Sequence, residues 1–195
     1  MSSQTPLQET FSILEKDLAF AREQWQKSDT PYTRRTLVRT STALMEGLVN
    51  QMGDFILETI DCGVEFLFTS AELSILKEET YSLNKKGEVD SRVNFQPFLP
   101  KLLHTAHCYM RLFGEDFNAN TGVYGWECMQ SLVKTRNRLM HPKGACDLEV
   151  SDKNFEMAQN AVEWFNDEFT DIFEKTKKRY NKMLKVMDAA DSGAH

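Results

Sequence analysis

The sequence has few of the residues that interrupt helices or cross-link chains. Its 195 residues include five prolines and nine glycines, too few for long flexible linkers or for a β fold rich in turns. The four cysteines, at positions 62, 108, 128 and 146, form no CxxC pair and no regular spacing. We therefore expect reduced thiols in a cytosolic protein and no disulfide framework.

The sequence also lacks long hydrophobic runs and an excess of positive charge. Its most apolar stretch, residues 64–76, is interrupted by Glu65 and Glu72 and is too short and too charged to span a bilayer. The first thirty residues are polar and charged, unlike a signal peptide, so we expect a cytoplasmic protein without a membrane partner. The net charge of −6 argues against non-specific coating of nucleic acid, although a local basic patch can still bind RNA.

What the sequence does contain is helical periodicity, with apolar residues recurring every three or four positions. We expect an all-α fold, a single domain over 1–187 built as a bundle of five to six helices, and a disordered tail over 188–195. The expected helices are an accessory one within 1–29, then 33–61, a short one from about 70, then 97–113, 123–140 and 152–187.

Two helices have apolar stripes that bear on the later argument. The expected stripe of 33–61 consists of Leu37, Ser41, Leu44, Leu48, Gln51, Phe55 and Thr59, widened by Val49, Met52 and Ile56. The expected stripe of 123–140 consists of Trp126, Met129, Leu132, Val133, position 136 and Met140. Ser70 is a possible N-cap of the short helix. Residues 80–96 are compatible with either a loop or a small β-hairpin.

The last expected helix is longer than one small core requires. Its apolar seam continues over thirty residues and consists of Phe155, Val162, Phe165, Phe169, Phe173, Tyr180, Met183 and Met187. A seam of this length predicts that part of the helix packs against another subunit.

The residues with plausible chemistry lie at the end of the helix 123–140. Arg136 falls on an apolar stripe, and a charge in that position needs a partner because an unpaired buried charge is costly. Asn137 and His141 are four residues apart and share the neighbouring face. Pro142 disfavours the α conformation at His141, so this histidine is expected to end the helix.

Together these side chains suit phosphate chemistry. A histidine that can hold or release a proton near neutral pH is suited to general acid–base work. A guanidinium beside it can bind a phosphate through two parallel hydrogen bonds, so the group could cleave RNA without a metal or other cofactor. The alternative is structural, because Arg, Lys and His followed by Pro and Gly are also an ordinary way to end a helix.

The stretch Arg136-Asn137-Arg138-Leu139-Met140-His141 resembles the signature of HEPN domains, an arginine followed after four to six residues by a histidine. HEPN domains are small helical bundles, and many are metal-independent endoribonucleases in toxin–antitoxin and antiphage systems. The aliphatic and aromatic run 126–133 before the motif and the long helix 152–187 after it are similar to the family pattern. The run 41–46, which ends in an acid, resembles an earlier HEPN helix. The resemblance covers about 33–187.

The resemblance implies roles for individual residues. Arg136 and His141 would be the catalytic pair, Asn137 would orient them or the scissile phosphate, and Glu46 would support Arg136. Active HEPN nucleases usually join two motifs across a homodimer. A toxin or antiphage role would bring an antitoxin or another defence-system protein as partner. Lys143 stands where some HEPN toxins carry a modified tyrosine, which puts that form of control in doubt.

Other residues have weaker claims. RNA contact is predicted for Arg39, Arg138 and Lys143, although for Arg39, with Arg34 and Arg35, the pattern favours a solvated face over an RNA groove. His104 and His107 lack the further ligands of a zinc site and are expected to be partly solvated. Cys128 and Cys146 are expected to be packed thiols rather than nucleophiles.

Three hypotheses follow from the sequence. The first is a HEPN-type endoribonuclease that acts on RNA as a homodimer. The second is a catalytically silent HEPN-like module that binds a nucleotide or a protein. The third is a helical adaptor that uses its long final seam.

Overall fold

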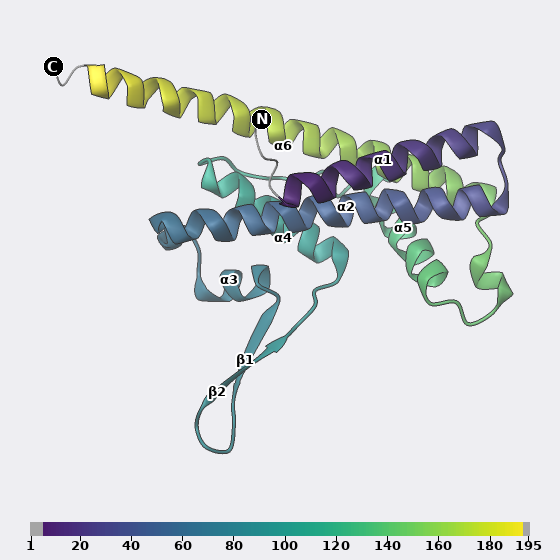
Figure 1. Cartoon of the computed structure of the whole chain (residues 1–195), viewed down its shortest axis with the longest axis horizontal. Coiled ribbons are helices and arrows are strands. Elements are labelled where there is room, and N and C mark those ends of the chain that lie inside the picture. Colours follow the sequence, from purple (N-terminus) through teal and green to yellow (C-terminus); the bar gives the residue numbers. More distant parts are fainter. Residues whose placement is uncertain (1–5, 193–195) are drawn as a thin grey trace. The chain divides into compact units, whose positions relative to one another are not determined.

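The computed structural model describes residues 6–192, without the side chains of 6–8, 61, 62, 65 and 186–192 (Figure 1). The expected all-α class is confirmed: the described chain has six α-helices and one two-stranded antiparallel sheet. The helices are α1 (Pro6–Lys27), α2 (Pro31–Thr59), α3 (Ser70–Leu76), α4 (Phe98–Leu112), α5 (Tyr124–Met140) and α6 (Asp152–Ser192). Within the described range, no helix has both the length and the apolar composition needed to cross a membrane.

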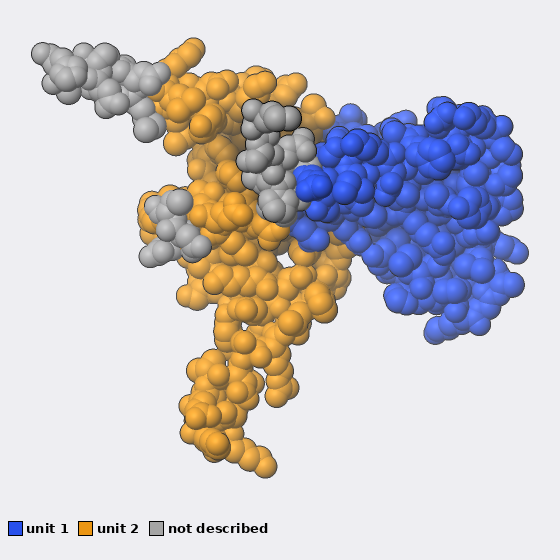
Figure 2. All heavy atoms as spheres, viewed as in Figure 1, with its two compact units in different colours: residues 1–51, 120–167 blue, residues 52–119, 168–195 orange. Residues whose placement is uncertain are grey.

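The chain separates into two compact units, coloured differently in Figure 2. The first comprises Met1–Gln51 and Asn120–Asp167, and the second comprises Met52–Ala119 and Glu168–His195. Two helices, α2 and α6, contribute residues to both units. The expected single domain over 1–187 stays a prediction.

The α2 helix buries only part of the stripe expected for it: Leu37, Ser41, Val49, Met52 and Ile56 are buried as predicted. The predicted stripe included Leu44, Leu48 and Phe55, but the first two are half-buried and Phe55 is exposed. The buried row is Val38, Thr42, Met45, Val49, Met52 and Ile56. The row that contains Leu44 and Leu48 is adjacent to the buried row and is also largely apolar, so periodicity alone did not show that Leu44, Leu48 and Phe55 would lie outside the core.

The α5 helix shows the same one-residue shift near its end. Met140 was expected on the buried stripe and is 48% exposed, whereas Leu139 is only 1% exposed. The core face of α5 runs through Cys128, Met129, Leu132, Thr135 and Leu139. Arg136 therefore lies at the edge of this face and is half-buried.

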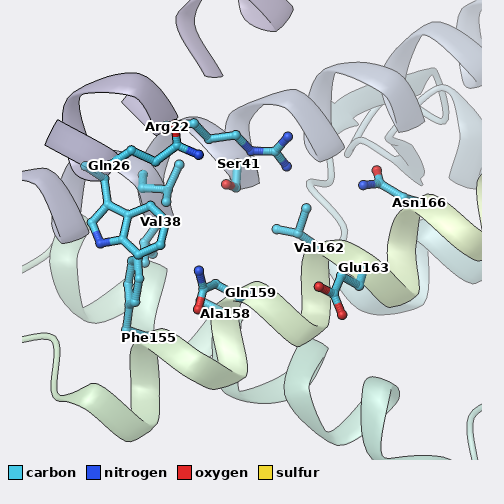
Figure 3. Close-up of a pocket in the computed structure, with 12 residues that line it drawn as sticks. Arg22, Gln26, Val38, Ser41, Phe155, Ala158, Gln159, Val162, Glu163 and Asn166 are labelled. Carbon is cyan, nitrogen blue, oxygen red and sulfur yellow. The ribbon is translucent and has the colours of Figure 1, made fainter. Parts of the chain in front are cut away.

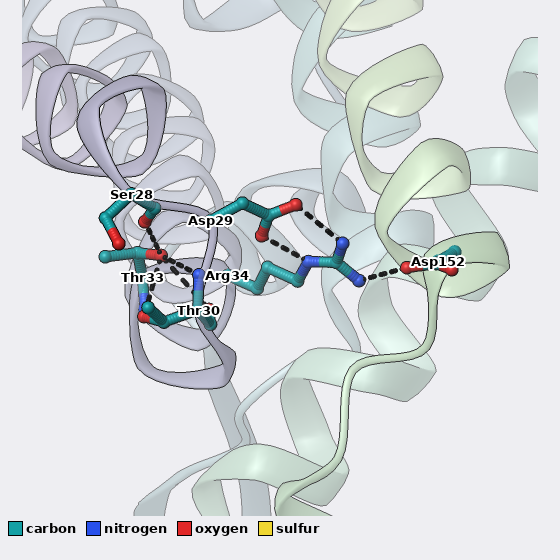
Figure 4. Close-up of polar contacts among 6 residues, drawn as sticks. All are labelled: Ser28, Asp29, Thr30, Thr33, Arg34 and Asp152. Carbon is teal, nitrogen blue, oxygen red and sulfur yellow. Dashed lines mark hydrogen bonds and ion pairs between the residues drawn. The ribbon is translucent and has the colours of Figure 1, made fainter.

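The turn between α1 and α2 is fixed by hydroxyl groups (Figure 4). Thr30 acts as the N-cap of α2, since its hydroxyl accepts a hydrogen bond from the Thr33 amide at 3.2 Å. The buried Thr33 hydroxyl donates to the Ser28 carbonyl at 2.9 Å. Pro31, at the first helical position, loses no hydrogen bond there. The helix consequently begins at Pro31, two residues before the expected start.

The second unit has its own apolar core. The buried residues at its centre are Ile56, Ile60, Phe68, Leu76 and Cys108. A π-helical turn, Ile60–Val64, follows α2 and contains Gly63, whose φ of 99° is a conformation that suits glycine. The cap of α3 is Thr69 rather than the expected Ser70, because Thr69 and Glu72 form a reciprocal capping box.

Residues 80–96 contain a β-hairpin, one of the two alternatives that the sequence left open. Strand β1 (Glu79–Leu83) pairs with β2 (Val89–Val93), and Leu83 lies opposite Val89. Asn84 closes the turn, since its side-chain oxygen accepts from the amides of Lys86 and Glu88. Gly87 has a φ of 79°, a conformation that suits glycine.

The α6 helix continues past the expected boundary at 187. It reaches Ser192, so the start of the expected disordered tail is helical, and residues 193–195 lie outside the described residues. The last part of the predicted seam is not buried within the chain: Phe173, Tyr180 and Met183 are exposed, as is the neighbouring Leu184. The side chain of Met187, also predicted for the seam, lies outside the described residues. This surface fits the expectation that part of the helix contacts another subunit, which stays a prediction.

We expect Gly125→Ala to destabilise the protein by about 1–3 kcal/mol, because the added methyl group would overpack the core. A Cβ atom at Gly125 would lie 2.5–2.7 Å from three atoms of Trp164. Urea unfolding followed by circular dichroism measures the change.

The matched control is Gly53→Ala, within α2, where an added Cβ meets nothing within 4 Å. Here the better helix propensity of alanine should give a gain of about 0.5–1 kcal/mol. Equal effects of the two substitutions would contradict the close packing of Gly125 against Trp164.

Candidate functional site

The end of α5 places the motif histidine at the protein surface. His141 is the C-cap residue, with φ −129° and ψ 58°, so it leaves the α conformation at the residue before Pro142, as expected. Its amide donates to the Asn137 carbonyl at 3.0 Å. The side chains of both residues are exposed and can reach a ligand from solvent.

Arg136 has the acidic partner that its position requires. Its Nη2 lies 2.8 Å from Oε2 of Glu46, an α2 residue ninety positions earlier in the chain. Nη1 donates to the side-chain oxygen of Asn137 at 3.1 Å. The side chains of Arg136 and Glu46 are 28% and 30% exposed. Solvent therefore screens the pair, which contributes at most about 1 kcal/mol to stability.

This geometry determines what the site can do chemically. A guanidinium has five N–H donors, and Glu46 and Asn137 accept from two of those of Arg136. The carboxylate orients the guanidinium while leaving other donors for an oxyanion such as a phosphate. The proposed catalytic group thus consists of a fixed cation, an amide and an exposed imidazole. Their catalytic roles stay predictions.

Three arginines hold the segment that follows α5. Arg138 donates from Nη1 to the Cys146 carbonyl at 2.9 Å and from Nη2 to the Glu149 carbonyl at 2.7 Å. From α2, Arg39 donates to the Leu139 carbonyl at 2.7 Å and Arg35 to the Leu148 carbonyl at 3.2 Å. These contacts fold the chain between α5 and α6 around the short helical turn Ala145–Leu148.

A fourth arginine ties the start of α2 to the start of α6 (Figure 4). Arg34 binds both carboxylate oxygens of Asp29, at 2.5 and 2.6 Å, and Asp152 at 2.5 Å. It also lies 5.3 Å from the ring centre of Phe155. The hydrogen bonds of Arg34 lower the pKa of the Asp29 carboxyl, and those of Asp29 and Asp152 raise the pKa of the guanidinium.

The predicted RNA-binding residues therefore differ in whether their side chains are already hydrogen-bonded within the chain. Arg39 and Arg138 both donate to main-chain carbonyls of this chain, which gives them a structural role that the sequence did not indicate. The side chain of Lys143 is exposed, while its amide donates to the Asp147 carboxylate at 2.7 Å. RNA contact by the three residues stays a prediction.

The other polar residues considered from the sequence do not form a metal centre. Among the described side chains, no three His, Cys, Asp or Glu residues are grouped to share a metal ion. His104 lies 3.7 Å from Cys108, whose burial raises its thiol pKa to about 11. Partial desolvation lowers the pKa of the His107 imidazole, although the residue is exposed, and the positive charge of Arg111 adds to this effect. Cys128 is buried as expected, whereas Cys146 is exposed and was wrongly expected to be packed.

The first unit also contains a cavity of about 420 Å³ between α1, α2 and α6 (Figure 3). Its apolar wall includes Val38 and Phe155, and Arg22 and Glu163 carry its charges. Ser41 is only 4% exposed and is directed into the cavity in Figure 3. The volume lies within the range of small-molecule pockets.

The cavity was not predicted from the sequence, although the sequence contained one signal of it, a serine on the expected apolar stripe of α2. Ser41 was a hydroxyl on a stripe expected to be apolar. The nearby Thr36, Thr40 and Thr42 each donate to the carbonyl four residues earlier. Within the described residues Ser41 makes no such bond. Ser41 and Glu46 are five residues apart and lie on different faces of α2, and no residue of the 136–141 motif lines the cavity.

Comparisons of the chain with protein-family models, with curated proteins and with solved structures find no match. Functional inference must therefore come from the residues themselves and from the motif resemblance.

We expect Arg138→Lys to loosen the segment between α5 and α6, because one ammonium group cannot reproduce two hydrogen bonds from a planar fork. Hydrogen–deuterium exchange over 142–150 should accelerate roughly fivefold, equivalent to about 1 kcal/mol. Arg22→Lys is the control, since the structure shows no ion pair or hydrogen bond for Arg22 within the described chain. Unchanged exchange in the Arg138 variant would show that the two carbonyl contacts do not hold the segment.

The cysteines should differ in reactivity. Iodoacetamide at pH 8 should modify the exposed Cys146 in the native protein and spare Cys108, whose raised pKa and burial disfavour the thiolate. Cys128 is buried with a raised pKa and should also be spared. Peptide mass mapping measures each site, and labelling in urea is the control in which all should react. Rapid native labelling of Cys108 would contradict its burial.

Proposed function

We propose that the protein is a metal-independent endoribonuclease of the HEPN type, and that Arg136, Asn137 and His141 act on RNA. The observation that carries the proposal is the arrangement at the end of α5. A guanidinium is oriented by Glu46 and Asn137, and an exposed histidine ends the same helix. The order of residues in this arrangement is the one that resembles the HEPN signature.

The proposed reaction uses the RNA 2′-hydroxyl as the nucleophile. An imidazole takes the 2′-OH proton, the 2′-oxygen forms a bond to phosphorus, and the bond from phosphorus to the 5′-oxygen breaks. An imidazolium gives a proton to the departing 5′-oxygen. Arg136 stabilises the additional negative charge on the phosphoryl oxygens. The products carry a 2′,3′-cyclic phosphate and a 5′-OH, and the reaction needs no metal or other cofactor.

One motif supplies one imidazole, whereas this reaction uses an acid and a base. We therefore propose a homodimer in which His141 of two copies act together, one as base and the other as acid. The exposed apolar residues near the end of α6, Tyr180, Met183 and Leu184, are one surface available for association. In the proposed biological role, a cytoplasmic toxin or antiphage nuclease, an antitoxin or a defence-system protein would control the activity.

One observation favours a second candidate, the catalytically silent HEPN-like module. The ion pair between Arg136 and Glu46 would serve equally well to join α5 to α2 while the motif binds a nucleotide or a protein. The partial exposure of both side chains and the exposure of His141 favour the nuclease, because a purely structural ion pair requires neither access to solvent nor an exposed histidine at the end of the same helix.

The experiment that separates the two candidates compares the purified protein with His141→Ala and Arg136→Ala on mixed RNA. For the nuclease, we expect each substitution to reduce cleavage by about a hundredfold or more. EDTA should have no effect, and the product ends should be 2′,3′-cyclic phosphate and 5′-OH.

His107→Ala is the control, because this exposed histidine lies on α4, outside the motif. It should leave cleavage unchanged, and circular dichroism should show that all variants fold. Equal cleavage by the native protein and His141→Ala would rule out the proposed chemistry. Absence of cleavage together with RNA binding that requires Arg136 would support the silent module.

A further inference from the structure

The β-hairpin is amphipathic, and its apolar side is uncovered. In the register of the two strands, Tyr81, Leu83, Val89 and Val93 share one face with Glu79 and Ser91, and the four apolar side chains are 51–72% exposed. The opposite face carries Thr80, Ser82, Asp90 and Arg92. Figure 1 shows the hairpin extending away from α3 and α4 of its own unit. A two-stranded hairpin is marginally stable alone, so this feature indicates an association surface.

The outer edge of β2 has free main-chain groups at defined positions. The hydrogen bonds Asn84–Glu88 (2.9 Å) and Asn94–Glu78 (2.7 Å) close the ladder at its two ends. Because hydrogen-bonded pairs alternate in an antiparallel ladder, Asp90 and Arg92 bond to β1. The amides and carbonyls of the intervening residues, Val89, Ser91 and Val93, therefore point away from β1 toward the free edge.

The sequence of this edge is complementary to itself. Strand β2 reads Val89-Asp90-Ser91-Arg92-Val93, and reversing it about Ser91 exchanges valine with valine and aspartate with arginine. An antiparallel pairing of two β2 edges with a two-fold axis at Ser91 therefore sets each Asp90 opposite Arg92 of the second copy. Neither side chain forms an ion pair within the described residues, and the Asp90 carboxylate accepts a long hydrogen bond, 3.5 Å, from the Asn84 side-chain amide. Both charges therefore lack an opposite charge within the described chain.

The main-chain geometry favours the same register. When two β2 strands pair about Ser91, position 91 lies opposite position 91 of the second copy, and position 89 lies opposite position 93. The outward amides and carbonyls of these positions then face one another. All of these groups then form hydrogen bonds. Asp90 and Arg92 fall at the pairs without main-chain bonds, where opposing side chains are closest. The β1 edge, reversed about Tyr81, sets Glu79 opposite Leu83 and forms no charge pair.

We infer that the hairpin joins two copies of this chain by antiparallel pairing of their β2 strands about Ser91, with reciprocal ion pairs between Asp90 and Arg92. The contact is isologous, as two-fold symmetry requires. A five-residue edge is small beside the roughly 1,200–2,000 Å² of a stable interface, so the association is reversible. The inference does not depend on nuclease activity, since association is measured without RNA.

The first test exchanges the charges in the full-length chain. In the proposed pairing, residue 90 of each copy faces residue 92 of the other, so either substitution, Asp90→Arg or Arg92→Asp, creates two pairs of like charges. Each should raise the dimer dissociation constant at least about tenfold in sedimentation equilibrium. The double variant Asp90→Arg/Arg92→Asp restores opposite charges and the native net charge, so its dissociation constant should return to within about threefold of native.

The second test reports on the register. Two cysteines at the axis would lie at a Cα separation of about 5.5 Å, which suits a disulfide. In a Cys62→Ser/Cys146→Ser background, oxidation of the Ser91→Cys variant should give a covalent dimer. Ser82→Cys is the matched control, because it lies on β1, away from the proposed axis, and should remain largely uncrosslinked.

Several results would overturn the inference. The first is that the native protein stays monomeric at all accessible concentrations. The second is that the dissociation constant of the double variant does not return toward the native value. The third is that the cysteine variants at positions 82 and 91 crosslink equally. Association only with a different protein would also overturn it. A strictly monomeric protein would also contradict the composite nuclease site, whereas a failed charge rescue or equal crosslinking would contradict the hairpin contact alone. RNA cleavage is measured separately with the His141 and Arg136 variants, so failure of the hairpin contact is distinguishable from failure of the proposed nuclease function.

Discussion

The need to satisfy main-chain carbonyls at the end of α5 shapes the region around the motif. The last carbonyls of a helix have no partner within it, and the residues that follow α5 form only one short helical turn. Arginine side chains supply the donors, from Arg39 to Leu139 and from Arg138 to Cys146 and Glu149. These bonds fix the main chain on both sides of His141, so the histidine is exposed without being on a free loop.

The same bonds change the interpretation of the basic residues. A cluster of arginines in a sequence suggests a phosphate-binding surface, but here Arg34 is bound by Asp29 and Asp152 and Arg39 by a carbonyl. Arg136 differs from these because its partners, Glu46 and Asn137, accept from only two of its five N–H donors and leave the others for a ligand. Local contacts, rather than the overall charge of −6, thus decide which cations are available to a ligand.

The sequence predicted the helices well because periodicity is a local property. It placed α5 and α6 within a few residues, but it selected Met140 rather than Leu139 as buried, since adjacent apolar residues are equivalent until a neighbouring helix packs. The contact of Arg39 with Leu139 joins residues one hundred positions apart and left no local signal. The requirement for a partner at Arg136 was predictable, because a charge at the edge of a core needs one.

The motif proposed for catalysis and the hairpin proposed for association lie in different compact units. A composite site needs a second motif nearby, and a contact elsewhere in the chain can supply it by raising the local concentration of the second copy. A weak hairpin contact would then suffice, because it need only hold two chains together while the site assembles. If the nuclease proposal holds, weakening the hairpin should reduce activity mainly at low protein concentration, whereas loss of His141 should reduce it at every concentration.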